Sequence, residues 1–161
     1  MVCCRHYNAA AMNKAFCKEP DASLPPRCPA CGGDGVQVMP QTLAAHVGPA
    51  AGETLAEPAY FCAGDTCPVA YFDLLERTIA KAAAHGLPWP KDPAGPLCAC
   101  HGLTVDDVDR DVAEGVPVRV REVVRKAAAP GAECAIRSAD GRSCVARVQR
   151  FYMRRRGAGG G

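Results

Sequence analysis

Eight of the eleven cysteines in this chain fall into two sets of four, arranged as short-spaced pairs. Thiolates in such pairs are ligands for zinc and for iron–sulfur clusters. The first set is spaced C-x2-C and then C-x4-C, and the second is spaced C-x-C and then C-x9-C. In each set, two pairs must meet across a long intervening segment. The sets are Cys28, Cys31, Cys62 and Cys67, and Cys98, Cys100, Cys134 and Cys144.

The first spacing is typical of a structural zinc site. Four thiolates fill every tetrahedral position, so neither water nor substrate can bind the metal. Gly32 permits the tight turn of CPACGGDG, and Gly64 lies in the looser loop of FCAGDTCP. Two alternatives are buried free cysteines and iron in place of zinc, since thiolate sites discriminate weakly between metals. An odd number of cysteines argues against a disulfide framework.

The second spacing suits an iron–sulfur cluster better than a single zinc ion. In C-x-C, one spacer separates two sulfurs that can reach one or both irons of a small cluster. Two helices are expected to return the chain to the second pair. Thr104 is a suitable N-cap and Gly115 a stop for the first, and the second spans 118–129. A third helix is expected to begin at Cys144.

Composition restricts the function classes. Aromatic residues make up 6% of the chain and the net charge is +2, which favours neither nucleic-acid nor membrane binding. No segment has the length of a membrane span, and the N-terminus does not resemble a secretory signal. We therefore expect a cytoplasmic, metal-binding protein. No Ser/His/Asp set or phosphate-binding loop is visible, so an electron carrier is favoured over an enzyme.

The ordered motifs resemble two families. LCACHGLT (97–104), DDVDRDV (106–112) and the closing Cys134 and Cys144 resemble the [2Fe-2S] domain of bacterioferritin-associated ferredoxins, although that family closes with a shorter pair. CPACGGDG, VMPQTLAAHV (38–47) and YFCAGDTCPVAYF (60–72), followed by the cluster motifs, resemble the N-terminal region of CopZ-type copper chaperones. The copper-carrying domain of that family, with its G-M-x-C-x-x-C loop, has no counterpart in this sequence.

The resemblance implies an α+β chain, in which a small zinc-ribbon-like β module precedes a helical [2Fe-2S] domain. It implies zinc on Cys28, Cys31, Cys62 and Cys67, and a [2Fe-2S] cluster on Cys98, Cys100, Cys134 and Cys144. Whether copper binds transiently is left open. The expected divisions are a leader and linker at 1–26, a zinc-binding module at 27–85, a Pro-rich linker at 86–96, a cluster domain at 97–153 and a flexible tail at 154–161.

Within the zinc module, short strands are predicted at 35–40, 59–62 and 68–72, while 73–85 fits either a helix or a strand. Trp89 in the linker is expected to pack on a neighbouring module.

The resemblance also implies a function. The chain would reduce Cu(II) to Cu(I) for a separate copper chaperone or a copper-transporting ATPase, with an unknown electron donor. The alternatives are a general ferredoxin of the bacterioferritin-associated type, which reduces another partner, and a non-redox interaction or sensing module in which both metals are structural. Gene neighbourhood and cluster reduction would separate these functions.

Several residues near the motifs carry weaker signals. Arg137, Arg142 and Arg147 fit either a solvated basic face or a role beside the cluster. His101 is expected in a turn and not as a ligand, because four cysteines are already present. The polar loop AIRSADGRS (135–143) is predicted to expose the cluster. Cys3, Cys4 and Cys17 lie in a leader that fits either a soft-metal site or a disordered extension, and Arg154–Arg156 suit a helix C-terminus.

Overall fold

The computed structural model describes residues 25–158, so the leader lies almost wholly outside the described part. Its N-terminal half is a four-stranded antiparallel sheet in the order β1-β2-β3-β4. The strands are β1 (Gly35–Val38), β2 (Ala59–Cys62), β3 (Val69–Asp73) and β4 (Thr78–Ala80). The sequence predicted the first three of these strands, and all three are confirmed.

Both faces of the two central strands, β2 and β3, are buried. Phe61 pairs with Tyr71 across β2 and β3, and both belong to the larger apolar core on one face. Tyr60 pairs with Phe72 on the other face, in a small core that contains three of the cysteines of the first set. Because every residue of β2 and β3 is buried, these strands read as continuous apolar runs without polar alternation.

Two short helices cover the larger core beside β1, α1 (Pro40–Val47) and α2 (Pro49–Gly52). The sequence motif at 38–47 was not assigned to a helix, and this element was missed. A proline starts each helix, where its missing N–H costs nothing. Thr42, Leu43 and His46 are the buried residues of α1, and only Leu43 is apolar, so the helical pattern is weak.

The ambiguous segment 73–85 contains β4 and a single 3₁₀ turn, η2 (Lys81–Ala83). The carboxylate of buried Asp73 explains the choice. It accepts hydrogen bonds from the backbone N–H groups of Leu75 and Arg77, which closes a tight turn directly after β3. Leu74 and Leu75 remain exposed, so their apolar spacing does not contribute to a core.

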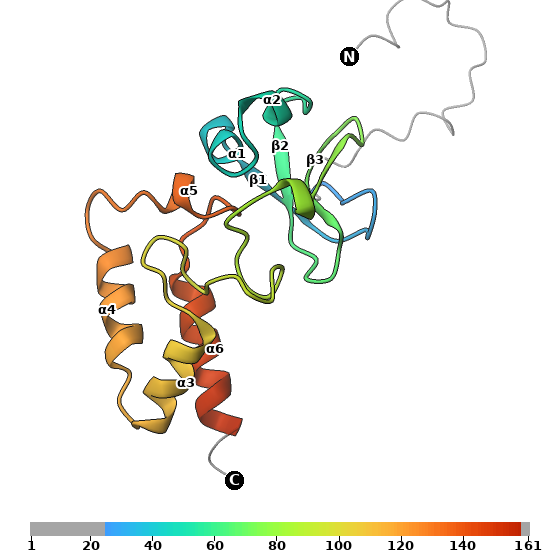
Figure 1. Cartoon of the computed structure of the whole chain (residues 1–161). Coiled ribbons are helices and arrows are strands. Elements are labelled where there is room, and N and C mark those ends of the chain that lie inside the picture. Colours follow the sequence, from blue (N-terminus) through green and yellow to red (C-terminus); the bar gives the residue numbers. More distant parts are fainter. Residues whose placement is uncertain (1–24, 159–161) are drawn as a thin grey trace, which may run out of the picture.

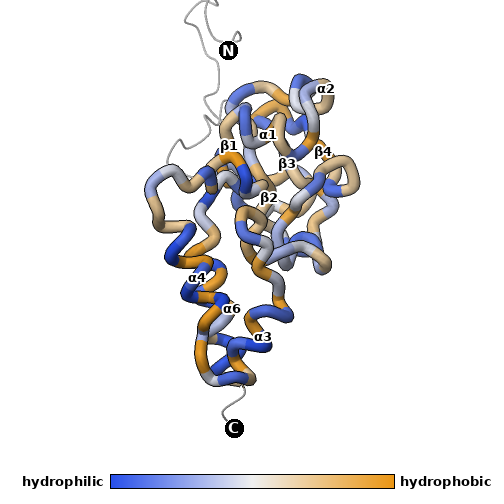
Figure 2. The backbone as a smooth tube through the Cα atoms, turned by 60° about the vertical axis from the view of Figure 1, so that its left-hand side comes forward, coloured by the Kyte–Doolittle hydropathy of each residue, from blue (hydrophilic) through white to orange (hydrophobic). Residues whose placement is uncertain are grey.

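The C-terminal half is a small helical domain of α3 (Val105–Ala113), α4 (Val118–Ala127) and α6 (Val145–Ala158), with one turn of helix, α5 (Cys134–Arg137), between α4 and α6. Apolar and polar positions alternate along α4 and α6, as Figure 2 shows. The three long helices agree with the sequence prediction. The predicted flexible tail is helical as far as Ala158. The core of the domain is built mainly from Leu97, Leu103, Val108, Val120, Val123, Val148, Phe151 and Tyr152.

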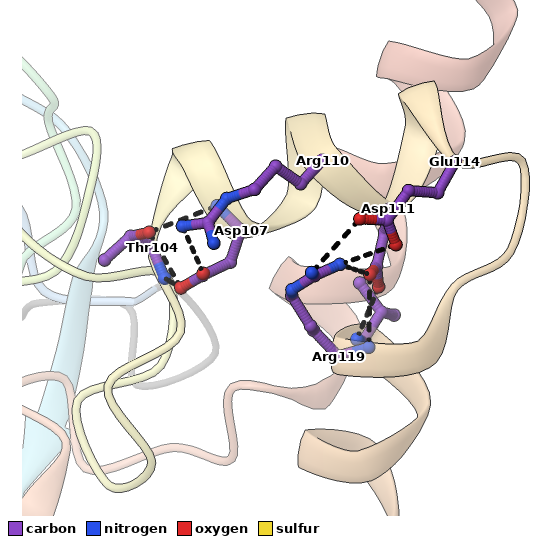
Figure 3. Close-up of polar contacts among 7 residues, drawn as sticks. Thr104, Asp107, Arg110, Asp111, Glu114 and Arg119 are labelled. Atoms are coloured by element: carbon purple, nitrogen blue, oxygen red, sulfur yellow. Dashed lines mark hydrogen bonds and ion pairs between the residues drawn. The ribbon is translucent and has the colours of Figure 1, made fainter.

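Polar contacts fix the start of α3 and its connection to α4 (Figure 3). Thr104 and Asp107 form a capping box, in which each side chain accepts a hydrogen bond from the backbone N–H of the other. Fully buried Asp111 accepts hydrogen bonds from the backbone N–H of Val120 and from the Arg119 guanidinium, at 2.8 and 2.9 Å. The sequence predicted the cap at Thr104 but not the buried carboxylate at Asp111.

The two halves meet at the segment that follows Cys134. Figure 1 shows α5 lying between the sheet with its helices and the bundle of α3, α4 and α6. Three side chains of the N-terminal half lie within hydrogen-bond distance of backbone carbonyls of this segment. Thr42 donates to Ala135 at 2.5 Å, Tyr71 donates to Ala139 at 2.9 Å, and His46 Nε2 lies 3.2 Å from the carbonyl oxygen of Ile136.

The Pro-rich segment 86–96 makes the other connection between the halves. Trp89 packs edge-on against Phe151 of α6, with 4.8 Å between ring centroids, as predicted.

Candidate metal centres

The first four cysteines converge on one side of the sheet. Their sulfurs all lie within 4.8 Å of one another. Two come from the turn before β1, one ends β2, and one lies in the loop before β3. The sulfurs of Cys31 and Cys62 lie 3.6 Å apart, and those of Cys28 and Cys67 lie 3.9 Å apart. These separations suit four ligands around one tetrahedral ion.

Glycines allow the loops to close around these sulfurs. Gly32 has φ of +67°, a conformation that residues with a side chain rarely adopt. A Cβ at Gly64 would lie 3.1 Å from the Cys31 sulfur and 3.2 Å from Cys67 Cβ. A Cβ at Gly35 would lie 2.5 Å from the Phe72 ring. A side chain at either of the last two positions would therefore push the ligand loops apart.

The surroundings of the first site act on its thiols in opposite directions. The backbone N–H of Gly33 points at Cys31 Sγ at 3.4 Å, and this hydrogen bond holds the pKa of Cys31 below its ordinary value. Burial raises the pKa of Cys62 to about 12, while the Gly64 N–H and the Lys91 ammonium act in the opposite direction. Burial also raises the pKa of Cys67. Four deprotonated sulfurs this close together therefore need a cation among them.

Lys91 gives an independent reason to expect negative charge at the site. Its side chain comes from the Pro-rich segment 86–96 and is only 3% exposed. The ammonium donates to the carbonyl oxygen of Gly64 at 2.8 Å, in the loop between Cys62 and Cys67. A buried ammonium is costly unless a negative charge lies nearby. A zinc ion with four thiolates carries two net negative charges, so the residues present fit zinc.

The second set of cysteines lies where the helical domain meets the sheet domain. Cys98 and Cys100 lie in the turn before α3, which closes through an isolated bridge between Cys98 and Leu103. Cys134 begins α5 and Cys144 immediately precedes α6. Cys98 and Cys144 are 0% and 2% exposed, Cys134 is 8% exposed, and Cys100 is half-buried.

The thiols of this set interact in two pairs. A hydrogen bond with Cys144 lowers the pKa of Cys98 to about 6, and the same contact, together with burial, raises the pKa of Cys144. Burial and the neighbouring Cys134 raise the pKa of Cys100 to about 11. Among residues 25–158, only the first set brings three or more potential ligands within 4.8 Å of one another. The second set is thus looser than a single-ion site.

Arg147 contributes a positive charge beside the second set. Its side chain is 19% exposed, and its Nη1 donates to Asp140 while its Nε donates to the carbonyl oxygen of Leu97. Its Nη2 is buried and has no hydrogen-bond partner in the described part of the chain. A guanidinium with one buried donor that has no partner, one turn along α6 from Cys144, fits a site that would hold a negatively charged cluster. Of the two readings of Arg147, the solvated face is wrong.

The prediction that the loop 135–143 exposes the second set agrees with the burial pattern only in part. Ser138 and Ala139 are 3% and 0% exposed because the middle of the loop packs against the sheet domain. Arg137, near the start of the loop, is exposed and lines an opening next to half-buried Cys100. His101 lies exposed in the turn, as expected, and its backbone N–H helps to lower the pKa of Cys98. Cys3, Cys4 and Cys17 lie outside the described residues.

Sequence reasoning missed the residues that support the two centres from a distance. Thr42, His46, Tyr71 and Lys91 all act on backbone carbonyls far away in the chain. The motif VMPQTLAAHV contains Thr42 and His46, and polar residues inside an otherwise apolar helix were the only signal for them.

In residues 25–158, no helix has the length and apolar character that crossing a membrane requires.

Comparison with known proteins agrees with the zinc region. A family model of the CopZ-type zinc-binding domain matches residues 25–84. The copper chaperone CopZ of Archaeoglobus fulgidus is 28% identical over 129 residues, which are 78% of this chain and 61% of that protein. The chain therefore spans about three fifths of the length of this relative. The resemblance predicted for the N-terminal region is confirmed, since residues 25–84 match the CopZ-type zinc-binding domain.

The fold has a counterpart among solved structures. The crystal structure of the Archaeoglobus fulgidus CopZ N-terminal domain superposes with a TM-score of 0.65 at 23% identity. The match covers 78% of this chain and 97% of that one. The α+β arrangement of a small antiparallel sheet with several helices is thereby shared between the two.

Proposed function

We propose that this chain is a zinc-stabilised [2Fe-2S] electron-transfer protein that reduces Cu(II) to Cu(I) in copper handling. The observation that supports the proposal is the second set, in which Cys98 interacts with Cys144 and Cys100 with Cys134, partners that lie in separate segments of the chain after the zinc-binding region. Zinc would bind Cys28, Cys31, Cys62 and Cys67 and supply folding free energy. The cluster would bind Cys98, Cys100, Cys134 and Cys144.

Three features support a cluster at the second set. The pairing of Cys98 with Cys144 and of Cys100 with Cys134 provides two sulfurs for each of two irons. The looser spacing of the set leaves more room than one zinc ion needs. The unpaired Nη2 of Arg147 could donate a hydrogen bond to a sulfide or thiolate of the cluster.

The relative is the reason to connect this chain with copper. The Archaeoglobus protein is described as a copper chaperone, and this chain corresponds to part of its length. A reduced [2Fe-2S] cluster releases one electron, and Cu(II) accepts one to become Cu(I). No bond or proton has to move, so the two half-reactions balance. The product would pass to a separate copper chaperone or a copper-transporting ATPase, whose soft ligands prefer Cu(I).

The test is anaerobic stopped-flow mixing of the dithionite-reduced, desalted full chain with Cu(II) and a Cu(I)-specific chelator. Cluster reoxidation should match Cu(I) formation one for one. Because free thiols also reduce copper, the background chain carries Cys3→Ser, Cys4→Ser and Cys17→Ser. Cys100→Ser in that background should lose the rapid phase while it keeps its zinc.

Two results would argue for the alternatives. A cluster that reduces reversibly but reoxidises no faster with copper than without it would favour a general ferredoxin. A protein that takes up zinc at both sets, with no labile sulfide after reconstitution, would favour a non-redox module.

A further inference from the structure

The second cysteine set is exposed on one side only, and that side is positively charged. Cys98 and Cys144 are fully buried, whereas Cys100 and Cys134 line a cavity of about 260 Å³. Besides the two sulfurs, the charged residues of its lining are Arg125, Lys126, Arg137 and Glu133. His101 also lines it.

Arg137 is the cation best placed to contact a partner that binds at this cavity. It is exposed at the end of α5, and it takes part in none of the ion pairs among residues 25–158. Its positive charge acts on the sulfur of Cys100, where it lowers the pKa that burial and Cys134 raise. Arg125 and Lys126 pair with Glu122, but these pairs are exposed neighbours on one helix turn and exchange partners at little cost.

We infer that the cavity beside Cys100 and Cys134 is the electron-exchange surface of this chain, and that it docks a redox protein with an acidic face. The inference rests on the proposed cluster. Electron transfer slows steeply with distance, so an electron leaves from the iron nearest the solvent, which the exposure of the ligands places at the Cys100–Cys134 pair. Excess positive charge around that edge attracts an acidic surface and repels a basic one.

The opposite side cannot serve as this surface. There the sheet domain packs against the segment after Cys134, and Thr42 and Tyr71 bind the carbonyl groups of Ala135 and Ala139. Arg147, on the buried side, is engaged with Asp140 and Leu97. Of the three arginines near the ligands singled out in the sequence, Arg137 alone lines the opening at the sulfurs.

The test compares two redox proteins of opposite charge, acidic cytochrome b5 and basic cytochrome c. Each is mixed with the reduced full chain, and its haem absorbance reports the second-order rate. Arg137→Glu should slow the reduction of cytochrome b5 about tenfold at about 10 mM ionic strength and about threefold near 150 mM. The same change should speed the reduction of cytochrome c. Arg137→Gln should have an intermediate effect in both cases.

Arg150→Glu is the matched control, because Arg150 is exposed on α6 and lines a different cavity. Cluster absorbance and reduction potential are measured for every variant, so that a lost cluster or a changed driving force is not mistaken for lost docking. Equal effects of Arg137→Glu and Arg150→Glu would overturn the inference, and so would a rate with cytochrome b5 that is independent of salt. A chain that binds no iron would instead overturn the proposed function and the inference with it.

Discussion

The hydrogen bond between the Tyr71 hydroxyl and the Ala139 carbonyl offers a clean test of how the two halves depend on each other. The hydroxyl donates at 2.9 Å, and both residues are 0% exposed. Burial, together with nearby Asp140, raises the pKa of Tyr71, so the hydroxyl stays protonated and remains a donor throughout the accessible pH range. Tyr71→Phe removes only the donor and keeps the ring.

The expected cost follows from what the substitution leaves behind. The Ala139 carbonyl stays buried without this donor, and water has no access to replace it. Losing one partner of a buried neutral hydrogen bond destabilises by about 1–2 kcal/mol. For a chain of this size, that corresponds to a fall in Tm of about 3–6 °C. The same variant should lose the proposed cluster faster when iron chelator is added, because the segment after Cys134 is released from the sheet.

Tyr60→Phe is the matched control. Tyr60 is also buried in the sheet, where it stacks on Phe72, and its hydroxyl makes no hydrogen bond within the described part of the chain. Both variants are compared with the zinc-loaded parent chain by thermal unfolding and by the rate of cluster loss. If Tyr71→Phe and Tyr60→Phe fell within about 0.3 kcal/mol of each other, the reasoning about the contact between the halves would be refuted.

Three further predictions concern the metal centres and the turn after β3. Cys28→Ser should lower zinc content and thermal stability together, whereas Cys100→Ser should remove the cluster absorbance and leave the zinc; equal loss of stability in both would contradict the assignment. Lys91→Met should release zinc to a chelator about tenfold faster, because the buried ammonium no longer offsets the thiolate charge, and an unchanged rate would contradict that role. Burial raises the pKa of Asp73, but its hydrogen bonds from Ala56, Arg77 and Leu75 outweigh this and give a lowered pKa. The free energy of unfolding of the wild-type chain should therefore exceed that of Asp73→Asn by about 1–3 kcal/mol above pH 4 to 5, and this difference should shrink as the pH falls through the folded pKa. Urea unfolding of both chains at each pH measures the difference, and a difference independent of pH would refute the reasoning.

Local sequence signals predicted the parts of this molecule that depend on neighbours in the chain. The strands at Gly35–Val38 and Ala59–Cys62 agree with the structure, and so does the Thr104 cap. Cys28 and Cys31 lie close together because a short turn separates them, and the same holds for Cys62 and Cys67. The spacing predicted one four-thiolate site at Cys28, Cys31, Cys62 and Cys67, and the structure brings these four sulfurs within 4.8 Å of one another.

Contacts between distant segments could not be predicted from such signals. Thr42 binds a carbonyl 93 positions away, and Tyr71 binds one 68 positions away. A hydroxyl that recognises backbone leaves no trace in the residue types of its partner. This is also why the loop 135–143 was expected to be open. Its polar and small residues are typical of an exposed loop, and the burial of Ser138 and Ala139 comes from the domain that packs on it.

Recognition of backbone instead of side chains at this contact has a consequence for how the sequence can diverge. Thr42, His46 and Tyr71 each meet a carbonyl group, which every amino acid supplies. The residues that carry those carbonyls can therefore drift, apart from the size limit at fully buried Ala139. The three donors cannot drift in the same way. Substitutions should therefore be tolerated poorly at the three positions on the sheet side of the contact and readily at positions such as 135 and 136.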